Sequence, residues 1–441
     1  MSWLKTTDVR GAIVRPSPTS SSTLHFAPQR TGLDKLTFVL LCCLIFSVPF
    51  ETTFMMPGFG TISRLIGAIL LPVGVLAILA RGWMRRLAAP HWCMIAFAAW
   101  NMLSYFWTVS QVLTTERIFT EVQLVLVVLL VWQFCAPEKD ALTLIRAYVC
   151  GTLISCGETV YRFLSHQSTY YERFSAVGFD PNDLSLTLAI SVPLSYYLFV
   201  RHRGWVGCAW LLQIAAVIVA CLLTASRTGA LVVVLGLSLA LITIKSVSGA
   251  RRVALGLLAV LVVLGAISFT PASSWKRLST IGNEVRTGTL DSRTEIWAGG
   301  LELVRSKPFF GVGAGAFQDA VEPVISYFDV DHAYVAHNTF LSVMAELGLF
   351  GFILFSIFIV TIVATILKME PLLRKTYSVA FLVWVVGVMT LTWEHRKPTW
   401  ILFAFILQTA VPAANTFAPA LTNTRLTNGL RLPQFAVAPK R

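Results

Sequence analysis

The sequence has few charged residues, and acidic residues are the scarcest of them. Only 13% of its 441 residues are Asp, Glu, Lys or Arg, whereas 56% are hydrophobic. Ordinary soluble domains carry about 25% charged residues, so this scarcity excludes a water-soluble globular protein. The mean hydropathy of +0.72 is typical of a chain that lies mostly in lipid. The sequence therefore predicts an integral membrane protein.

The chain also lacks the cysteine pattern of a disulfide-stabilised or zinc-binding protein. Its eight cysteines fall within predicted membrane spans or at a span end, at positions 42, 43, 93, 135, 150, 156, 208 and 221. None lies in the long outer loop that we predict at residues 271–336. Neither a disulfide framework nor a zinc site is supported, and we expect no metal and no cofactor.

Basic residues outnumber acidic ones, which raises the question of a nucleic-acid partner. The formal net charge is +13, from 35 Lys and Arg against 22 Asp and Glu. No nucleic-acid-binding motif accompanies these cations. We interpret them as topological anchors in the short connections between spans, and we expect no nucleic-acid partner.

A membrane-spanning helix needs roughly 20 mostly apolar residues, and the sequence contains twelve candidate stretches. They are residues 35–51, 60–80, 91–108, 118–135, 141–164, 182–200, 205–224, 228–245, 252–270, 337–367, 376–393 and 398–414. The tenth is too long for one straight crossing, so we expect projecting ends or a kink. The predicted fold is an all-α polytopic membrane protein with about 12 transmembrane helices and one large outer loop.

Lys and Arg in the connections set the orientation. With the N-terminus inside, the cytoplasmic segments hold 21 of these residues and the short outer connections hold 7. This bias predicts that both termini are cytoplasmic. The predicted organisation is a disordered cytoplasmic tail (1–34), spans one to nine (35–270), a periplasmic loop (271–336), spans ten to twelve (337–414) and a second cytoplasmic tail (415–441).

Within the outer loop, residues 291–307 have the pattern of an amphipathic helix. Ser292 and Glu295 have capping-box spacing, and Trp297 belongs to an apolar stripe whose opposite face is polar. Such a helix either lies along the membrane surface or packs on the protein with one solvated face. The sequence leaves both interpretations open.

Two arginines are predicted at helix N-termini, where the helix dipole disfavours a cation. Arg293 opens the loop helix, and Arg227 follows Ser226, the predicted N-cap of the eighth span. Free backbone N–H groups, a hydroxyl and a guanidinium together form a phosphate-binding assembly. A bound anion would therefore explain these arginines. The alternative for Arg227 is contact with a lipid phosphate at the interface.

The sixth span also begins with polar residues. Asp180 as N-cap and Pro181 at the first helical position form a helix start signal, and Asn182 and Asp183 follow. Spans six, eight and ten all begin at the predicted outer face. We therefore expect their positive ends to form one anion site with Arg227, Arg293 and Arg173.

The tenth span begins at His337 and Asn338 and carries Glu346 nine residues further. A histidine with a pKa near neutrality suits a general base at a hydroxyl nucleophile, although a histidine at a membrane edge is more often structural. Glu346 lies about 13 Å deeper along the helix and on the opposite face. For Glu346 we favour a structural role with a buried partner.

Residues 311–315 contain three glycines and superficially match a nucleotide-binding loop. Neither a preceding strand nor a βαβ unit is apparent in the sequence. We interpret these residues as a tight re-entrant turn or a close-packing loop.

Several short motifs recur in an order that resembles a known family. They are Asp180-Pro181-Asn182-Asp183-Leu184, Ser226-Arg227-Thr228-Gly229, Ser292-Arg293 followed by Trp297, Pro308-Phe309-Phe310-Gly311-Val312-Gly313, His337-Asn338 and Glu346-Leu347-Gly348. The series resembles the O-antigen ligase and O-antigen polymerase superfamily of bacterial polysaccharide assembly. The resemblance is strongest from about residue 178 to 352.

The resemblance implies a membrane glycosyltransferase of lipopolysaccharide or exopolysaccharide biosynthesis in the inner membrane. Such enzymes transfer a glycan from a polyprenyl (undecaprenyl) diphosphate carrier to a sugar hydroxyl of lipid A-core or of another carrier-linked glycan. The reaction is an inverting displacement that needs no metal. The motifs assign diphosphate binding to Arg227 and Arg293, and assistance to the acceptor hydroxyl to His337. The expected substrate contacts are Ser226, Arg173, Asn182, Asp183, Asn338 and Trp297.

Three alternatives remain at this stage. The sequence does not distinguish a ligase from a polymerase, because both need the same donor site. A flippase for lipid-linked oligosaccharides, or another transporter, would place its charges near the middle of the membrane, whereas here the polar candidates lie at the outer edge. An acyltransferase would explain His337 but not the two arginines at helix starts.

Overall fold

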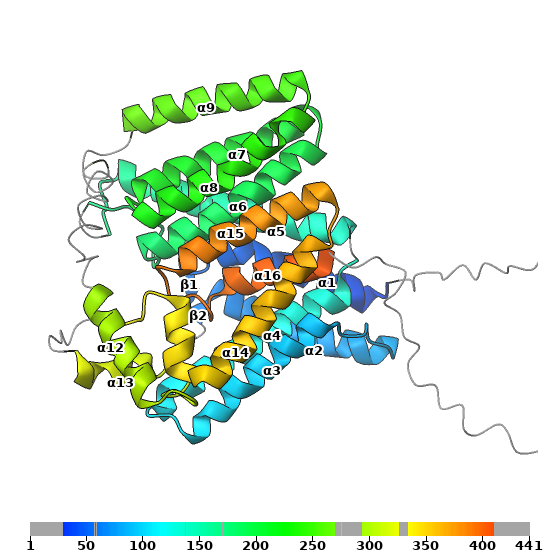
Figure 1. Cartoon of the computed structure of the whole chain (residues 1–441). Helices are drawn as coiled ribbons and strands as arrows, with labels where there is room; N and C mark the ends of the chain where they lie inside the picture. The colour runs from blue at the N-terminus through cyan, green and yellow to red at the C-terminus, as the bar shows by residue number, and fades with distance from the viewer. Residues whose placement is uncertain are drawn as a thin grey trace, which may run out of the picture.

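The computed structural model describes residues 30–56, 58, 60–136, 138–169, 172–269, 275, 293–325 and 334–409. These residues form helices, with one short antiparallel hairpin of β1 (Met55–Met56) and β2 (Gly60–Thr61) (Figure 1). The first group of helices is α1 (Gly32–Ser47), η1 (Val48–Phe50), α2 (Ile62–Arg81), α3 (Ala89–Leu103), η2 (Ser104–Phe106), α4 (Gln111–Phe134), α5 (Lys139–Leu164), α6 (Pro181–Arg201), α7 (Gly204–Leu223), α8 (Arg227–Thr243), η3 (Ile244–Ser246) and α9 (Gly249–Phe269). The second is α12 (Arg293–Ser306), α13 (Phe317–Val321), η5 (Glu322–Val324), α14 (Thr339–Leu367), α15 (Pro371–Val388) and α16 (Lys397–Thr409).

Eight helices of the described chain are long and apolar enough to cross a membrane: α1 with η1, α2, α4, α6, α7, α8, α14 and α15. The predicted all-α membrane fold is therefore confirmed. Helices α3, α5, α9 and α16 overlap the other four predicted spans. That these four also cross, giving 12 crossings, stays a prediction. The predicted tails lie largely outside the described residues, and so does much of the predicted periplasmic loop, including Ser292.

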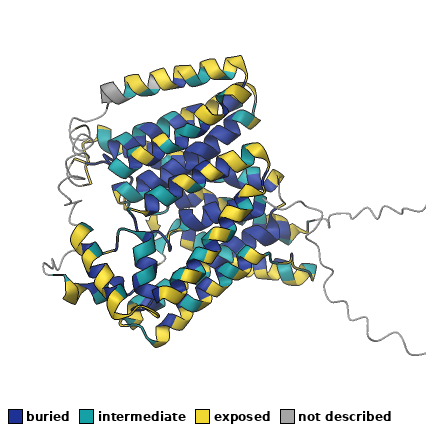
Figure 2. Cartoon of the chain, viewed as in Figure 1, coloured by how far each residue is buried: buried dark blue, intermediate teal, exposed yellow. Residues whose placement is uncertain are grey.

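Helix α6 is the most enclosed of the eight candidate spans, as Figure 2 shows by its dark blue colour. It packs against α5, α7, α8 and α15. Its buried hydroxyls find partners inside the bundle, as when Gln213 of α7 donates to Ser191 at 3.0 Å and accepts from Ser195. Hydrogen bonding between helices satisfies polar groups that lipid cannot. The helix that opens with the predicted polar motif is thus the rigid centre of the fold.

Helix α14 is kinked, as its length predicts. Gly348 has φ +65° and ψ −169°, which interrupts the helix. The glycine-rich loop 311–315 packs against this break: Val312 N–H donates to Ala345 O at 3.0 Å and Gly313 N–H donates to Glu346 O at 2.8 Å. A Cβ atom on Gly311 would lie 2.4 Å from the Glu346 carbonyl. The three glycines therefore serve close packing of backbone on backbone.

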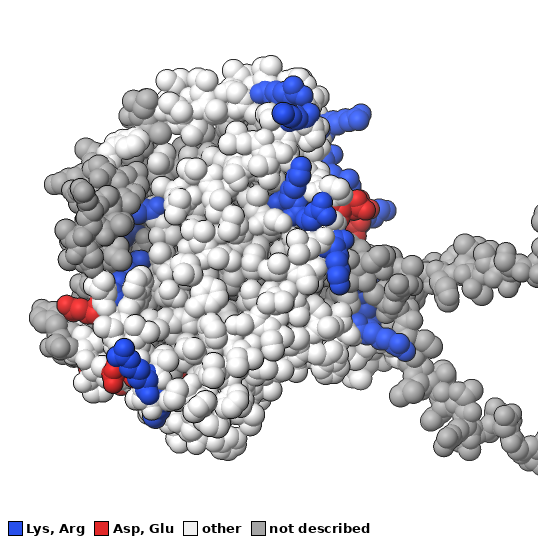
Figure 3. All heavy atoms as spheres, in the orientation of Figure 1, with Lys and Arg blue, Asp and Glu red and all other residues white. Residues whose placement is uncertain are grey.

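Charged side chains lie at two opposite edges of the bundle, with an uncharged band between them in the view of Figure 3. At one end, Arg30 pairs with Asp140 and Arg81 lies 3.8 Å from Asp34. At the other end lie the N-termini of α6, α8 and α14, which we call the site end. The sequence predicts that the site end is periplasmic.

Candidate functional site

The N-terminus of α6 is built by a cap, as the sequence predicts. The Asp180 carboxylate accepts from Asn182 N–H at 2.7 Å and from Asp183 N–H at 3.3 Å, and Pro181 occupies the first helical position. An acidic cap satisfies free N–H groups at the positive end of the helix. The side chains of Asn182 and Asp183 are thereby fixed at the site end.

Arg173, Asn182 and Ser226 meet at the first turns of α6 and α8. Asn182 Oδ1 accepts from the Arg173 guanidinium at 2.9 Å and from Ser226 Oγ at 2.8 Å. Ser226 also caps α8 by accepting from Gly229 N–H at 3.0 Å, as predicted. Arg227 is therefore held at the first residue of α8, directly beside this junction.

The glycine of this motif has a packing role. A Cβ atom on Gly229 would lie 2.5 Å from Ser185 Cβ of α6. Only a glycine lets α8 approach α6 this closely without a shift of backbone. The motif thus combines a cap, a cation and a close contact between helices.

His337 lies between α6, α12 and the start of α14. Its φ of +46° is uncommon for a residue with a side chain. Burial and the neighbouring charge of Arg293 lower the pKa of His337 to about 4, against the opposing charge of Asp180. His337 is therefore neutral at pH 7, with a pKa below the near-neutral value that the sequence suggests. Arg293, Asp180 and His337 lie near enough to act on one another electrostatically.

Two of the predicted substrate contacts use polar atoms within the protein. Trp297 Nε1 donates to Ala336 O at 3.0 Å, which ties α12 to the residue before His337. Asn338 caps α14, because its Oδ1 accepts from Phe340 N–H at 3.0 Å and Leu341 N–H at 3.1 Å. Both side chains therefore position the segment around His337.

The loop between α15 and α16 supplies residues that sequence reasoning missed. Trp393 Nε1 donates to Asp183 at 2.8 Å, and the Arg396 guanidinium lies 3.0 Å from the same carboxylate. We call the group at the starts of α6, α8, α12 and α14 the arginine cluster. It comprises Arg173, Asp180, Asn182, Asp183, Ser226, Arg227, Arg293, His337, Trp393 and Arg396.

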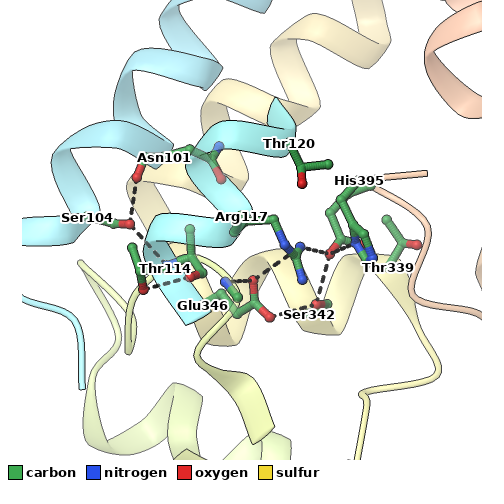
Figure 4. Close-up of polar contacts among 12 residues, drawn as sticks. Asn101, Ser104, Thr114, Arg117, Thr120, Thr339, Ser342, Glu346 and His395 are labelled. Carbon is green, nitrogen blue, oxygen red and sulfur yellow. Dashed lines mark hydrogen bonds and ion pairs between the residues drawn. The ribbon is translucent and has the colours of Figure 1, made fainter. Parts of the chain in front are cut away.

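A second polar group lies deeper, around Arg117 of α4 (Figure 4). The Arg117 guanidinium lies 2.7 Å from Glu394 and 3.7 Å from Glu346. Ser342 donates to both carboxylates, at 3.4 Å to Glu346 and 3.3 Å to Glu394. His395 Nδ1 lies 3.2 Å from Glu394 Oε1. We call these five residues the glutamate cluster.

Glu346, which the sequence places with a buried partner, has three kinds of contact here. Besides Arg117 and Ser342, its carboxylate accepts from Gly315 N–H at 2.7 Å. The kink of α14 and the glycine-rich loop therefore aim one carboxylate at Arg117. Glu346 does not approach the arginine cluster through any of these contacts.

Two residues of the glutamate cluster that lie in the loop between α15 and α16, Glu394 and His395, have lowered pKa values. Burial and the charge of Arg117 lower the pKa of His395 to about 4, although the contact with Glu394 opposes this. Burial alone would raise the pKa of Glu394, but the hydrogen bond with His395 and the charge of Arg117 lower it. At neutral pH, Glu394 is therefore an anion held by Arg117, and His395 is a neutral imidazole.

A cavity of about 970 Å³ adjoins the glutamate cluster. Its polar wall includes Arg117, Ser342, Glu346 and His395, and its apolar wall comes from α1, α2 and α4. It also reaches Ala336, the residue before His337. Among the described residues, no group of three His, Cys, Asp or Glu side chains is arranged to hold a metal ion.

Two signals in the sequence could have revealed the glutamate cluster. Arg117, just before the predicted span 118–135, and Glu121 within that span are a charged pair four residues apart. Residues 394–397 are four consecutive titratable side chains between two apolar stretches. From the sequence we interpret Arg117, Arg396 and Lys397 as topological anchors, whereas in the structure each of them pairs with a carboxylate.

The middle of the chain matches a known protein family. Residues 212–356 match the family model described as O-antigen ligase. The resemblance to the O-antigen ligase and polymerase superfamily is thereby confirmed. The matched region contains Ser226, Arg227, Arg293, His337 and Glu346. The comparison with curated proteins finds no match.

The family match and the apolar helices together support a coarse description of the protein. Its described apolar helices are those of a multi-pass membrane protein, and residues 212–356 are similar to O-antigen ligases. Enzymes of this type act in general on lipid-linked glycans. The matched region does not include α4 or the loop between α15 and α16, so it covers only part of each polar cluster.

Proposed function

We propose that this protein is a glycosyltransferase of the bacterial inner membrane. It moves a glycan from a polyprenyl diphosphate carrier to a sugar hydroxyl at the periplasmic face, by an inverting displacement that needs no metal. The observation that carries this proposal is the gathering of helix N-termini and arginines in the arginine cluster, of whose ten residues four, Ser226, Arg227, Arg293 and His337, lie within residues 212–356. Both termini are then cytoplasmic.

Diphosphate chemistry fits the arginine cluster. A diphosphate leaving group develops negative charge as the bond to the sugar breaks, so donors that hold it more tightly in the transition state lower the barrier. Arg227 lies at the N-terminus of α8 and Arg293 at that of α12. The backbone N–H groups of a helix N-terminus are suited to bind an anion. We assign both arginines to the diphosphate and Arg173 to their support.

His337 suits the acceptor side of the reaction. Its neutral imidazole can accept a hydrogen bond from the attacking hydroxyl and then its proton. The same neutrality avoids adding another cation beside Arg293. In this proposal Asn338 and Trp297 hold the backbone around His337, while Asn182, Asp183 and Ser226 line the donor site.

A deletion strain tests the proposal and separates its two forms. The surface glycans and the carrier-linked glycan pool are compared on gels. Long glycans accumulating on the carrier, with none on lipid A-core, identify a ligase. Single repeat units without longer chains identify a polymerase of O-antigen or exopolysaccharide. Unchanged glycans in both pools would contradict the proposed function.

A further inference from the structure

The cavity beside the glutamate cluster has the shape of a lateral entry from the membrane. Helices α2 and α4 approach each other at the end of the cavity marked by Leu130, the last α4 residue that lines it. There a Cβ atom on Gly74 of α2 would lie 2.7 Å from the Leu130 side chain. Elsewhere α2 packs along α1, and α4 packs along α3 and α16. Between this contact and their N-termini, α2 and α4 both line the cavity.

The cavity is deep enough for a lipid chain. Its lining along α4 runs from Leu113 to Leu130, about 25 Å of helix at 1.5 Å per residue. This length approaches the roughly 30 Å thickness of the hydrocarbon core. Part of this lining is polar, with Glu116, Thr120 and Gln123 on α4. Further along, Gly67, Ala68 and Leu71 of α2 face Leu124, Val127 and Leu130 of α4, which are all apolar. An isoprenoid or acyl chain would replace lipid along this apolar part.

The polar end of the cavity differs in chemistry from the arginine cluster. It presents carboxylates and neutral hydrogen-bonding groups, including Glu346, Ser342, Gln318 and Thr392. Three cations also line the cavity: Arg117 is held by Glu394, Lys397 is paired with Glu51, and Arg64 is exposed on α2. Carboxylate, amide and hydroxyl groups suit the hydroxyls of a sugar. Because two of the three cations are already paired with carboxylates, the polar end is better suited to hydrogen-bonding a glycolipid's sugar than to binding the leaving group of the donor.

The cavity and the arginine cluster both adjoin the segment that carries His337. Tyr334, Val335 and Ala336 line the cavity, and Arg293 acts on His337 from α12. The loop between α15 and α16 separates the two regions, since Trp393 contacts Asp183 and Glu394 contacts Arg117. A sugar in the cavity would therefore lie next to the segment that leads into His337.

From these observations we infer that the cavity between α2 and α4 is the acceptor site. It binds a glycolipid whose apolar chain enters between α2 and α4 and whose sugar contacts Ser342, Glu346 and His395. This inference rests on the proposed function, because it assigns the second substrate of the same reaction. The acceptor chemistry is a sugar on a long-chain lipid, which both lipid A-core and a carrier-linked glycan supply.

The substitution Gly67→Phe tests the inference by filling the cavity. A Cβ atom on Gly67 meets nothing within 4 Å, so a side chain there projects into open space. Gly157→Phe is the matched control, because Gly157 of α5 also has nothing within 4 Å and does not line the cavity. Transfer by the full-length protein in nanodiscs is measured as KM for donor and KM for acceptor, with lipid A-core and a carrier-linked glycan as separate acceptors.

We expect Gly67→Phe to raise the KM for acceptor at least about tenfold and to leave the KM for donor within about twofold of wild type. In the control Gly157→Phe, we expect both KM values to stay at those of wild type. The acceptor that is used, and whose KM rises, identifies the source of the glycolipid. An unchanged acceptor KM in Gly67→Phe, or a rise in donor KM instead, would overturn the inference while leaving the proposed function intact. No transfer by the wild-type protein to either acceptor would overturn the proposed function itself.

Gln318→Leu provides a second variant that adds no bulk. Gln318 of α13 lines the polar end of the cavity and is half-buried. Loss of its amide should raise the KM for acceptor severalfold through loss of a hydrogen bond to sugar, with little change in KM for donor. Gln111→Leu, at an exposed position that does not line the cavity, is its control. Equal acceptor KM values in the two variants would count against a sugar at this wall.

Discussion

The arginine cluster and the glutamate cluster lie at the same end of the bundle but hold their charges in different ways. In the glutamate cluster the carboxylates of Glu346 and Glu394 are 5% and 4% exposed and hold one arginine between them. In the arginine cluster, Arg396 is 50% exposed although it pairs with Asp183. A buried, internally paired group fixes local structure. A group of cations at helix starts is suited to an anionic ligand.

One loop connects the two clusters through four consecutive residues. Trp393 and Arg396 contact Asp183, whereas Glu394 and His395 belong to the glutamate cluster. Thr339 Oγ1 binds this loop to the start of α14 by donating to Leu391 O at 2.9 Å and accepting from Trp393 N–H at 2.8 Å. The comparison therefore predicts that changes in the glutamate cluster act first on stability, and changes in the arginine cluster first on rate.

The largest expected effect is on stability and comes from Arg117→Met. This change leaves Glu346 and Glu394 buried without their shared cation, which typically costs about 3–5 kcal/mol. We expect a large loss of thermal stability in detergent, measured by the unfolding transition. Combining Arg117→Met with Glu394→Gln should restore part of it, because one of the buried charges is removed. Arg305→Met, at an exposed ion pair on α12, is the control. Equal melting of Arg117→Met and the control would contradict a structural role for this cluster.

The next effect is on rate and comes from Arg227→Lys. A lysine retains the charge but not the bidentate geometry of the guanidinium. We expect turnover to fall about a hundredfold, which corresponds to about 3 kcal/mol of transition-state stabilisation. Melting should remain near that of wild type. Arg201→Lys, in the exposed pair with Glu138 at the opposite end, should leave turnover unchanged. Wild-type turnover by Arg227→Lys would remove Arg227 from the diphosphate site.

A smaller effect is expected from Trp393→Phe. The phenyl ring retains most of the buried volume but cannot donate to Asp183, which lies 2.8 Å from the indole nitrogen. A hydrogen bond to a charged group is worth about 1.5–3 kcal/mol. We expect a rate loss of roughly tenfold or more, with a modest loss of stability, because the loop joins both clusters. The comparison is with Trp205→Phe, at an exposed position on α7. A loss of stability without any loss of rate would place Trp393 with the glutamate cluster alone.

The smallest expected effect concerns the pH at which His337 takes up a proton, which is lower than for an ordinary histidine. Because the pKa of His337 is lowered to about 4, its imidazole stays neutral as the pH falls from 8 until it approaches 4. Its contribution to kcat/KM should therefore be constant between about pH 8 and 5.5, without the usual change near pH 6.5. Any stability that depends on the neutral form is lost as the pH falls from about 6.5 to about 4, since the unfolded chain binds the proton first. A midpoint near pH 6.5 that disappears in His337→Gln would contradict the lowered pKa.

The local features of the fold could be predicted from the sequence because they depend on neighbouring residues. The caps at Asp180 and Ser226 follow from residue types within four positions of each helix start. The kink in α14 follows from its length and its glycine. These signals are short in range, so one sequence carries them in full.

The glutamate cluster could not be assembled in the same way. Arg117 and Glu394 are 277 positions apart, and nothing in the local sequence of either indicates the other. Charge in apolar segments signals that a partner is needed, but it does not name the partner. The predicted anion site depended on three helix starts at one end, and those of α6, α8 and α14 lie there, each helix packing against α15. The roles of its arginines stay a proposal.

The most direct test of the proposed function uses the purified protein in nanodiscs with a fluorescent glycan on polyprenyl diphosphate and an unlabelled acceptor. We expect that the label moves to the acceptor, that polyprenyl diphosphate is released in equal amount, and that Arg227→Lys lowers both rates together. A label that stays on its carrier under conditions in which the protein is folded would contradict glycan transfer as the function of this chain.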